Sequence, residues 1–499
     1  MKHYRLPALL LAGAMTFGLA SCGSSSSSSG SASSAASGSG ASSANSAPAE
    51  IPQEALDDVV SYLTDGAYSK DDVVATVGDT TVSAAQMLYW TAYQQYYMTN
   101  YYYRNYGYTF QMSDTLQDGT TVADSLLATS VDTAMAYAVA TQKAHDLGVT
   151  LSDDNAKALE NLYANNVTSY GEDRWTTFVN AGLINEADFD DAAKNDWIQE
   201  HGAEFYTHSL MYYATTESGY QEMYNNNYYY NALQEHLFGE GGSEAPTDET
   251  INDYLQSYIS DNGIVWARCI LFSTQDAADD AAADEVLAQA QAVYDELALL
   301  PADQLSEAFT EKQSQYDKSG YTAGEVQRYS NSDSLVDGYY SAIAALEPGQ
   351  IAMTEKTDYG YFIVLREADQ PDTLRDSVKS SYIMSTYDSL ISQWKSEYGV
   401  GDVSLNIDAQ AFFTKLNELQ NTLYSIDNVS GTNTGSDSSA ASSSAAASGS
   451  GSNCSGQDRR QTAVFPLCRP QNLRAAQIFW NFSKKSLDFF APCRYNNQR

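Results

Sequence analysis

Basic residues are scarce in this chain of 499 residues. Its 26 lysines and arginines stand against 64 aspartates and glutamates, which gives a formal net charge of −38. Proteins that bind nucleic acid use lysine and arginine to neutralise phosphates, so nucleic acid is not an expected partner. The same charge keeps the chain away from anionic lipid surfaces. Any association with a membrane therefore requires an anchor.

Cysteine and histidine are also rare, with five of each. The cysteines have neither the spacing of a zinc site nor that of a disulfide framework. His201 and His208 are seven residues apart, and two scattered histidines make a poor metal site. The sequence has no glycine-rich phosphate loop and no nucleophile-elbow pattern. We therefore expect no metal and no cofactor.

The N-terminus has the plan of a signal peptide. Basic residues precede an apolar run from Leu6 to Leu19, which is too short to span a membrane as a helix. The letters LASC, which end at Cys22, look like a bacterial lipobox, and this resemblance implies a lipid on Cys22. Residues 23–50 are almost wholly serine, alanine and glycine, as expected of a tether. The alternative is an ordinary secretory signal, in which Cys22 has no special role.

The last stretch of the chain differs in composition from the rest. Residues 453–499 carry eight basic and two acidic residues, which leaves 18 basic and 62 acidic residues in the first 452. A Ser/Ala/Gly tract at 429–452 precedes this stretch and is typical of a linker. The basic tail could be an arm for cell-wall polymers or acidic lipid. We prefer the interpretation that it does not belong to the fold, for example because of a slip of the reading frame.

The region from residue 51 to 262 is mostly helical in pattern. In ADSLLATSVDTAMAYAVATQKAHDLG the apolar residues recur three and four apart, and Gly148 at its end is a good C-cap. Many of the 38 tyrosines crowd into residues 93–110 and 224–231. Tyrosine combines a large apolar face with a hydroxyl and suits a surface that holds extended peptides, although packing between helices accounts for some of these rings equally well. The candidates for such a peptide-binding cradle are Tyr97, Tyr101, Tyr102 and Tyr229.

The region from residue 263 to 369 predicts a compact α+β domain. IVWARCILF is a buried strand, three helical segments follow, and DYGYFIVLRE returns as a strand with a tight approach at Gly360. The order and spacing resemble a parvulin-type peptidyl-prolyl isomerase domain over about a fifth of the chain. The positions that carry the resemblance are 267–271, 314–317, Leu335, Tyr339, Leu346, Gly349 and 357–364.

The resemblance also implies a site, but with both family histidines replaced, by Cys269 and Phe362. By family position, the candidates for the catalytic network are Cys269, Asp317 and Thr357. The candidates for the proline pocket are Leu335, Tyr339 and Phe362. A thiol and a phenyl ring cannot bridge hydrogen bonds as two imidazoles do, so we expect a weak or silent enzyme and a buried, unreactive thiol.

The order of the parts resembles the PrsA- and SurA-type foldases. The segment DDVVATVGDTTVSAAQMLYW is similar to the opening of their N-terminal chaperone module, with Gly78 at a turn and Ser83 as a helix N-cap. The resemblance implies an α+β chain in which N- and C-terminal segments form a mostly helical chaperone module around an inserted parvulin-like domain, with disordered linkers on either side. The expected parts are a signal peptide (1–21), a tether (22–50), the helical module (51–262), the parvulin-like domain (263–369), closing helices (370–428), a linker (429–452) and the basic tail (453–499).

We therefore expect a lipid-anchored foldase on the extracytoplasmic face of a bacterial membrane. Its partners would be unfolded or nascent secreted polypeptides, held on the tyrosine-rich cradle. One alternative is a catalytically active isomerase that works through Leu335, Tyr339, Asp317 and Thr357. Another is a surface solute-binding or adhesion lipoprotein, which the anchor and the tyrosines would also suit.

Overall fold

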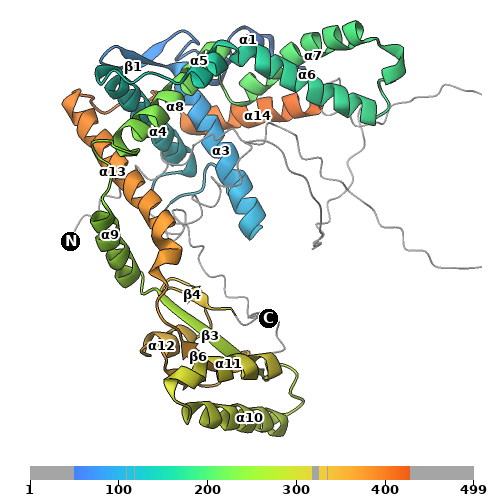
Figure 1. Ribbon diagram of the computed structural model, residues 1–499. Coiled ribbons are helices and arrows are strands. Elements are labelled where there is room, and N and C mark those ends of the chain that lie inside the picture. The colour runs from blue at the N-terminus through green and yellow to red at the C-terminus, as the bar shows by residue number, and fades with distance from the viewer. Residues whose placement is uncertain (1–49, 108, 117, 317–324, 334, 428–499) are drawn as a thin grey trace, which may run out of the picture. The chain divides into compact units, whose positions relative to one another are not determined.

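The computed structural model describes residues 50–427, except 108, 117, 317–324 and 334. Cys22, Asp317, the expected tether, the linker and the basic tail lie outside the described residues. The described chain divides into two compact units (Figure 1). The first unit contains residues 50–239 and 388–427, and the second contains residues 240–387. None of the described helices is long and apolar enough to cross a membrane.

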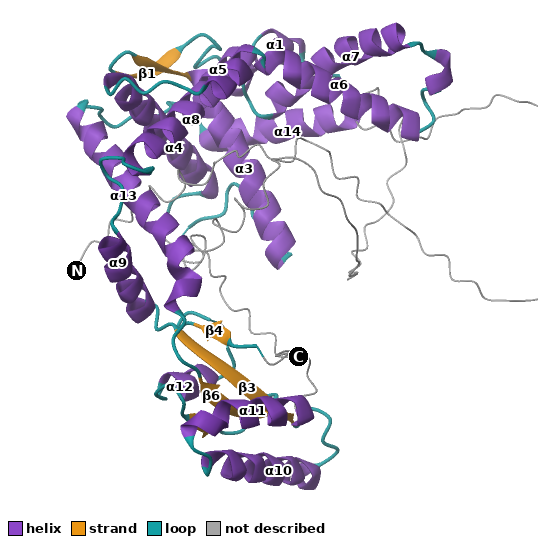
Figure 2. Cartoon of the chain, in the orientation of Figure 1, coloured by secondary structure: helices purple, strands orange, loops and turns teal. Residues whose placement is uncertain are grey.

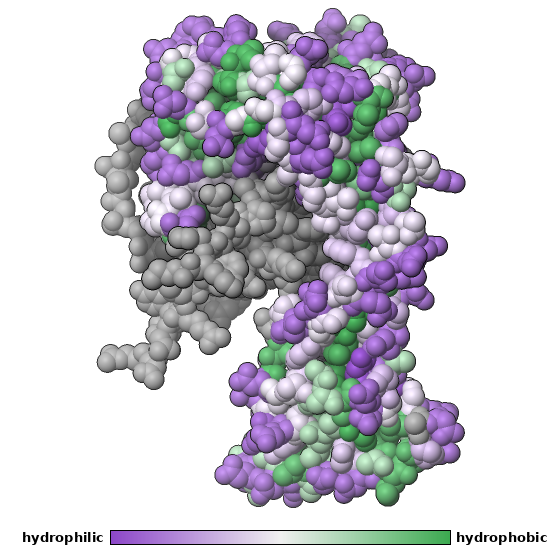
Figure 3. Space-filling model, turned by 90° about the vertical axis from the view of Figure 1, so that its left-hand side faces the viewer, coloured by the Kyte–Doolittle hydropathy of each residue, from purple (hydrophilic) through white to green (hydrophobic). Residues whose placement is uncertain are grey.

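Helices dominate the described chain, and the strands form two small antiparallel sheets, as Figure 2 shows. The predicted α+β class is thereby confirmed. On the face shown in Figure 3, hydrophilic and hydrophobic residues are interspersed on both units.

The first unit is a helical module with one β-hairpin. Its elements are α1 (Gln53–Asp57), α2 (Val59–Leu63), β1 (Val73–Val77), β2 (Thr80–Ser83), α3 (Ala84–Tyr106), α4 (Val122–Asp146), α5 (Asp153–Glu160), α6 (Leu162–Asn180), η2 (Glu186–Asp188), α7 (Asp191–Tyr212), α8 (Glu217–Phe238), the second half of α13 (Arg375–Glu397) and α14 (Ala409–Asp427). Contacts between aromatic rings join its three central helices. Trp90 of α3 lies 5.1 Å from Tyr137 of α4, which lies 4.7 Å from Tyr230 of α8.

The predicted turn and cap residues of this unit are confirmed. Gly78 has φ +56° between β1 and β2, where a side chain would also collide with Gln142. The hydroxyl of Ser83 accepts a hydrogen bond from the backbone N–H of Gln86 at 3.1 Å and so caps α3. Gly148 has φ +69° just after the end of α4, as a C-cap glycine does.

Helices α6 and α7 form a hairpin that depends on two glycines. A Cβ atom at Gly171 of α6 would lie 2.1 Å from the carbonyl oxygen of Ile198, and one at Gly202 of α7 would lie 2.0 Å from that of Val167. Neither position has room for a side chain, so the two helix backbones come into direct contact. Helix α14 packs beside α7 in the same unit.

The second unit contains a four-stranded antiparallel sheet in the order β4-β3-β6-β5. Its elements are α9 (Asp248–Asp261), β3 (Val265–Ser273), α10 (Asp280–Ala298), α11 (Ala302–Tyr316), β4 (Gln327–Tyr329), α12 (Tyr339–Ala344), β5 (Ile351–Met353), β6 (Gly360–Arg366), η3 (Pro371–Leu374) and the first half of α13. Gly360 begins β6 at φ +130°, and a Cβ atom there would lie 2.1 Å from the carbonyl oxygen of Phe272. The tight approach expected at this glycine is present.

Side chains alternate between the two faces of this sheet. Ile270, Phe272 and Ile363 belong to a core with α10 and α11, whereas Cys269 and Val364 belong to a second core with α12. The unit also includes the helices that precede and follow the sheet in the chain. Helix α9 packs with η3 and the start of α13. Leu255, Ile264, Trp266, Leu374 and Val378 form that third cluster.

One half-buried carboxyl group in the first unit has an oxygen that is buried at an energetic cost. Oδ1 of Asp388, on α13, is inaccessible to solvent and has no hydrogen-bond partner in the described chain. Burial raises the pKa of Asp388 from 3.8 to about 7, and no charged group offsets this rise. The charge of Asp388 also contributes to the raised pKa of Tyr137 on α4. The ionised carboxylate is therefore destabilising in the folded state.

We predict that Asp388→Asn stabilises the protein at alkaline pH. Because the folded pKa lies above the unfolded one, the native state binds more protons between about pH 4 and pH 7. The contribution of Asp388 to stability therefore falls as the pH rises through this window and stays low above it. With allowance for partial solvation, the free energy of unfolding of the variant at pH 8 should exceed that of the wild type by about 2 kcal/mol.

Urea unfolding at pH 4.5 and pH 8 measures this difference. Asp402→Asn, at an exposed position in the loop after α13, is the matched control and should leave both values unchanged. If Asp388→Asn retains the pH profile of the wild type, the cost assigned to Asp388 is wrong.

Candidate functional site

Four of the residues expected at the proline pocket and the catalytic network lie together on the α12 side of the sheet of the second unit. Cys269 and Tyr339 are buried, each 4 % exposed, and Leu335 and Phe362 pack against the same cluster. The ring of Tyr339 meets the ring of Phe362 edge to face at 4.9 Å. We call this group, together with Tyr329, the slot.

The polar groups of the slot interact with one another. The hydroxyl of Tyr339 donates to the hydroxyl of Tyr329 at 3.1 Å, and the thiol of Cys269 interacts with Tyr339 as well. Burial raises the pKa of Tyr329 to about 12 and that of Tyr339 further, with Cys269 adding to the rise for Tyr339. Both phenols therefore stay neutral at physiological pH and can donate hydrogen bonds.

Sequence reasoning missed Tyr329. This residue reaches the slot because β4 pairs with the start of β3, where Tyr329 lies opposite Val265. A three-residue strand carries no periodic signal, so only the fold brings this hydroxyl to Tyr339.

The other two expected catalytic positions are not part of this group as described. Thr357 closes the turn before β6: its hydroxyl donates to the carbonyl of Gly360 at 2.7 Å, and its backbone N–H donates to the same oxygen at 2.9 Å. Asp317 lies outside the described residues.

The slot can offer binding, desolvation and hydrogen bonds from hydroxyl groups. Rotation about a prolyl bond breaks no covalent bond, so an enzyme needs an apolar grip on the ring and stabilisation of the twisted amide. The slot offers rings and neutral hydroxyls. The sequence places no histidine between residues 240 and 387, so no imidazole comes from the second unit.

A second candidate site lies in the first unit, where tyrosines from three helices meet. We call this set the tyrosine face: Tyr89, Tyr93, Tyr96, Tyr97 and Tyr101 of α3, Tyr212 of α7, Tyr213 just after it, and Tyr220, Tyr224 and Tyr228 of α8. All except the buried Tyr89 are half-buried. Along each helix the rings succeed one another four residues apart, as the stacked pair Tyr97 and Tyr101 shows at 6.2 Å.

Contacts among these rings join the helices within this face, including that of Tyr96 on α3 with Tyr212 on α7 at 6.3 Å. The ring of Tyr89 lies 5.6 Å from Tyr220 and 5.7 Å from Tyr213. Tyr213 in turn lies 6.3 Å from Tyr93 and 6.0 Å from Tyr96. Burial raises the pKa of Tyr93 to about 12, so its hydroxyl stays neutral at physiological pH. Ring contacts thus link eight tyrosines of the face, and Tyr97 and Tyr101 continue it along α3 as a stacked pair.

The four tyrosines expected to form the cradle divide between two environments. Tyr97 and Tyr101 belong to the tyrosine face. Tyr102 is buried and its ring meets Phe110 at 5.8 Å. Tyr229 meets His145 of α4 at 4.6 Å. Tyr229 therefore contributes to packing outside the face, whereas the buried Tyr102 packs against its edge, with its ring 5.6 Å from that of Tyr101.

A comparison with protein families identifies part of the second unit. Residues 270–368 match the rotamase family model, described as the PPIC-type PPIASE domain. The chain contains a parvulin-type domain. The match runs from β3 through β6 and covers every residue of the slot except Cys269, which directly precedes it. The resemblance of this region to the parvulin-type isomerases is confirmed.

The chain is also similar to solved structures. Foldase protein PrsA from Streptococcus pneumoniae shares 15% identity over 53% of this chain and 91% of its own, with a TM-score of 0.16. The peptidylprolyl isomerase PrsA from Bacillus cereus shares 14% identity over 70% and 99%, with a TM-score of 0.20. Such low values carry no argument about the whole chain, so the parvulin assignment rests on the family match. No curated protein matches the chain.

Proposed function

We propose that this protein is an extracytoplasmic, lipid-anchored foldase. It holds unfolded secreted polypeptides on the tyrosine face, and its parvulin-type domain is catalytically degenerate. The observation that carries the proposal is the set of ring contacts that links tyrosines of α3, α7 and α8, in a chain that also contains a parvulin-type domain. The lipobox-like LASC and the tether support the anchor.

The tyrosine face has the chemistry that a client-binding surface needs. Each ring offers a large apolar area and loses little entropy on binding, because its side chain has only two torsions. Each neutral hydroxyl can donate to or accept from the exposed backbone of an extended chain. Such a surface binds unfolded segments of varied sequence, since it requires no particular side chain in return.

The slot supports a degenerate rather than an efficient isomerase. Phe362 takes the place of a histidine and stands edge-on to Tyr339 at 4.9 Å, so part of the slot is filled by the protein itself. Cys269 takes the place of the other histidine and is buried. The second candidate function is an active isomerase. The hydrogen-bonded hydroxyl groups of Tyr339 and Tyr329 favour it, because such groups polarise a bound amide.

Removal of the α3 rings of the tyrosine face should abolish most client binding. We predict that the full chain with Tyr93, Tyr97 and Tyr101 all changed to Ser requires about ten times more protein for half-suppression of aggregation of a chemically unfolded client, a loss of about 1.4 kcal/mol. Light scattering on dilution of the client from denaturant measures this concentration.

Two matched variants control this experiment. Changing Tyr163, Tyr359 and Tyr424 to Ser removes three exposed rings outside the face and should have no effect. Changing the three α3 residues to Phe retains the apolar area and should retain most of the suppression. Circular dichroism verifies that each variant is folded. Equal loss in both Ser variants would reject the tyrosine face as the client-binding surface.

The degenerate domain should not accelerate prolyl isomerisation. We predict that the full chain leaves the cis–trans exchange of a short Xaa-Pro peptide at its spontaneous rate, with a time constant of tens of seconds. Exchange NMR spectroscopy with and without the protein measures this rate. Acceleration that disappears in Tyr339→Ala would establish the active isomerase instead.

A further inference from the structure

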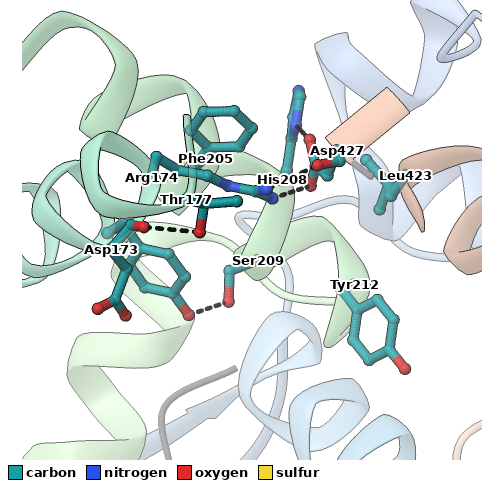
Figure 4. Close-up of a pocket in the computed structure, with 10 residues that line it drawn as sticks. Asp173, Arg174, Thr177, Phe205, His208, Ser209, Tyr212, Leu423 and Asp427 are labelled. Atoms are coloured by element: carbon teal, nitrogen blue, oxygen red, sulfur yellow. Dashed lines mark hydrogen bonds and ion pairs between the residues drawn. The ribbon is translucent and has the colours of Figure 1, made fainter. Parts of the chain in front are cut away.

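Helix α14 ends beside the tyrosine face. Its last residue, Asp427, lines a small pocket together with Tyr212, which belongs to the tyrosine face (Figure 4). Two turns earlier on α14, Nε2 of Gln420 donates to the carbonyl of Tyr212 at 3.0 Å. The ring of Tyr212 lies 6.3 Å from that of Tyr96 on α3. The part of the chain that follows Asp427 therefore starts next to the surface proposed to hold clients.

Two side chains fix Asp427 in this place, as Figure 4 shows. Its Oδ1 lies 2.8 Å from Nδ1 of His208 on α7, and its Oδ2 lies 3.5 Å from Nη2 of Arg174 on α6. Nη1 of Arg174 also donates to the backbone carbonyl of Asp427 at 2.6 Å. The side chains of Asp427 and His208 are only 8 % exposed. These contacts hold the last turn of α14, so the chain beyond it departs from a fixed point.

The segment that starts here has the opposite charge to the rest of the chain. The Ser/Ala/Gly tract at 429–452 leads to the basic tail at 453–499. The tail has eight basic and two acidic residues, whereas the first 452 residues have 18 basic and 62 acidic. Opposite net charges attract, and salt screens this attraction only beyond about 10 Å. We therefore expect the tail to be drawn to the body of its own chain.

The side chains of the tail suit the tyrosine face. The tail contains six arginines and the aromatic segment IFWNF at 478–482. Guanidinium groups stack on tyrosine rings, and other aromatic rings pack against them edge to face. An unfolded segment with such side chains is what the tyrosine face is proposed to hold. The tail therefore does not have to belong to the fold in order to bind this face.

The linker is long enough for this contact. A Ser/Ala/Gly chain of the length of 429–452 has a root-mean-square end-to-end distance of about 27 Å. Along α7, His208 is separated from Tyr212 by a single helical turn, which rises about 6 Å. A flexible linker of this reach gives its end an effective concentration of about a millimolar at the face. A competitor at that concentration lowers the apparent affinity of the face for clients.

We propose that the basic tail, residues 453–499, binds the tyrosine face of its own chain and competes there with clients. The proposal rests on the proposed function, because it assumes that the face holds unfolded segments. The tail covers the apolar rings when no client is present. Clients that bind more tightly, or that are in excess, displace it.

Photocrosslinking without a client tests the contact itself. A photoreactive phenylalanine analogue is placed at Tyr97 of the full chain, and mass spectrometry identifies the crosslinked segment. We expect crosslinks to residues 453–499 with a yield that does not depend on protein concentration, because they form within one molecule. An excess of unfolded client should reduce this yield about fivefold. The analogue at the exposed Tyr163, outside the face, is the control and should give background yield.

Substitutions in the tail of the full chain test the competition. The tail variant changes three aromatic residues to Ser: Phe479, Trp480 and Phe482. It should reach half-suppression of client aggregation at about one fifth of the wild-type protein concentration, because the competing segment binds more weakly. The matched control changes three polar residues of the same tail to Ser: Gln471, Asn472 and Gln477. This control should leave the concentration for half-suppression unchanged.

The remaining outcomes separate this proposal from the proposed function. Crosslinks from position 97 that weaken on dilution would indicate a second copy of the chain, and crosslinks to residues 23–50 would indicate the tether. Either result, or equal effects of the tail variant and its control, would overturn the proposal and leave the tyrosine face standing. Absence of tail crosslinks, together with unchanged suppression in the Tyr93, Tyr97 and Tyr101 variant, would overturn both.

Discussion

The close contact between helices α3 and α8 determines where the tyrosines of the first unit gather. A Cβ atom at Gly219 would lie 2.6 Å from the Cβ of Ala85, so only glycine allows this approach. The hydroxyl of Thr215, just before α8, donates to the carbonyl of Ala85 at 2.9 Å and fixes the contact from the other side. Because the helices are this close, the tyrosines of α8 can reach Tyr89 of α3. Without the contact, the two tyrosine-bearing helices would present separate stripes rather than one surface.

The second unit depends on strand register in a similar way. The pairing of β3 with β6 sets Cys269 opposite Val364 and Leu271 opposite Phe362. Alternation then turns Cys269 toward α12, where Tyr339 lies. Apolar residues and strand register thus determine how Cys269 and Phe362 come to share one face of the sheet with Tyr339.

The sequence predicted features that depend on local chemistry. Gly78, Ser83 and Gly148 mark turns and caps that neighbouring residues determine, and the slot followed from the spacing of a known domain. Contacts between residues that are distant in the sequence could not be predicted in this way. Tyr213 and Tyr220 join the tyrosines of α3 only through the packing at Gly219, and Arg174 meets Asp427 across 253 positions of the chain. Helix α9 lay within the predicted helical module, but it packs with η3 in the second unit. Amphipathic periodicity shows that a helix has an apolar face but does not identify the element that covers it.

The central claim is that clients are held on the tyrosine face and not at the slot. Site-specific photocrosslinking tests it most directly. A photoreactive phenylalanine analogue is placed in turn at Tyr97, at Phe362 and at the exposed Tyr163, and the full chain is irradiated with an unfolded client. The account predicts strong crosslinking from position 97 and background crosslinking from positions 362 and 163. Crosslinking from position 362 that equals or exceeds that from position 97 would contradict it and place the client at the parvulin-type domain.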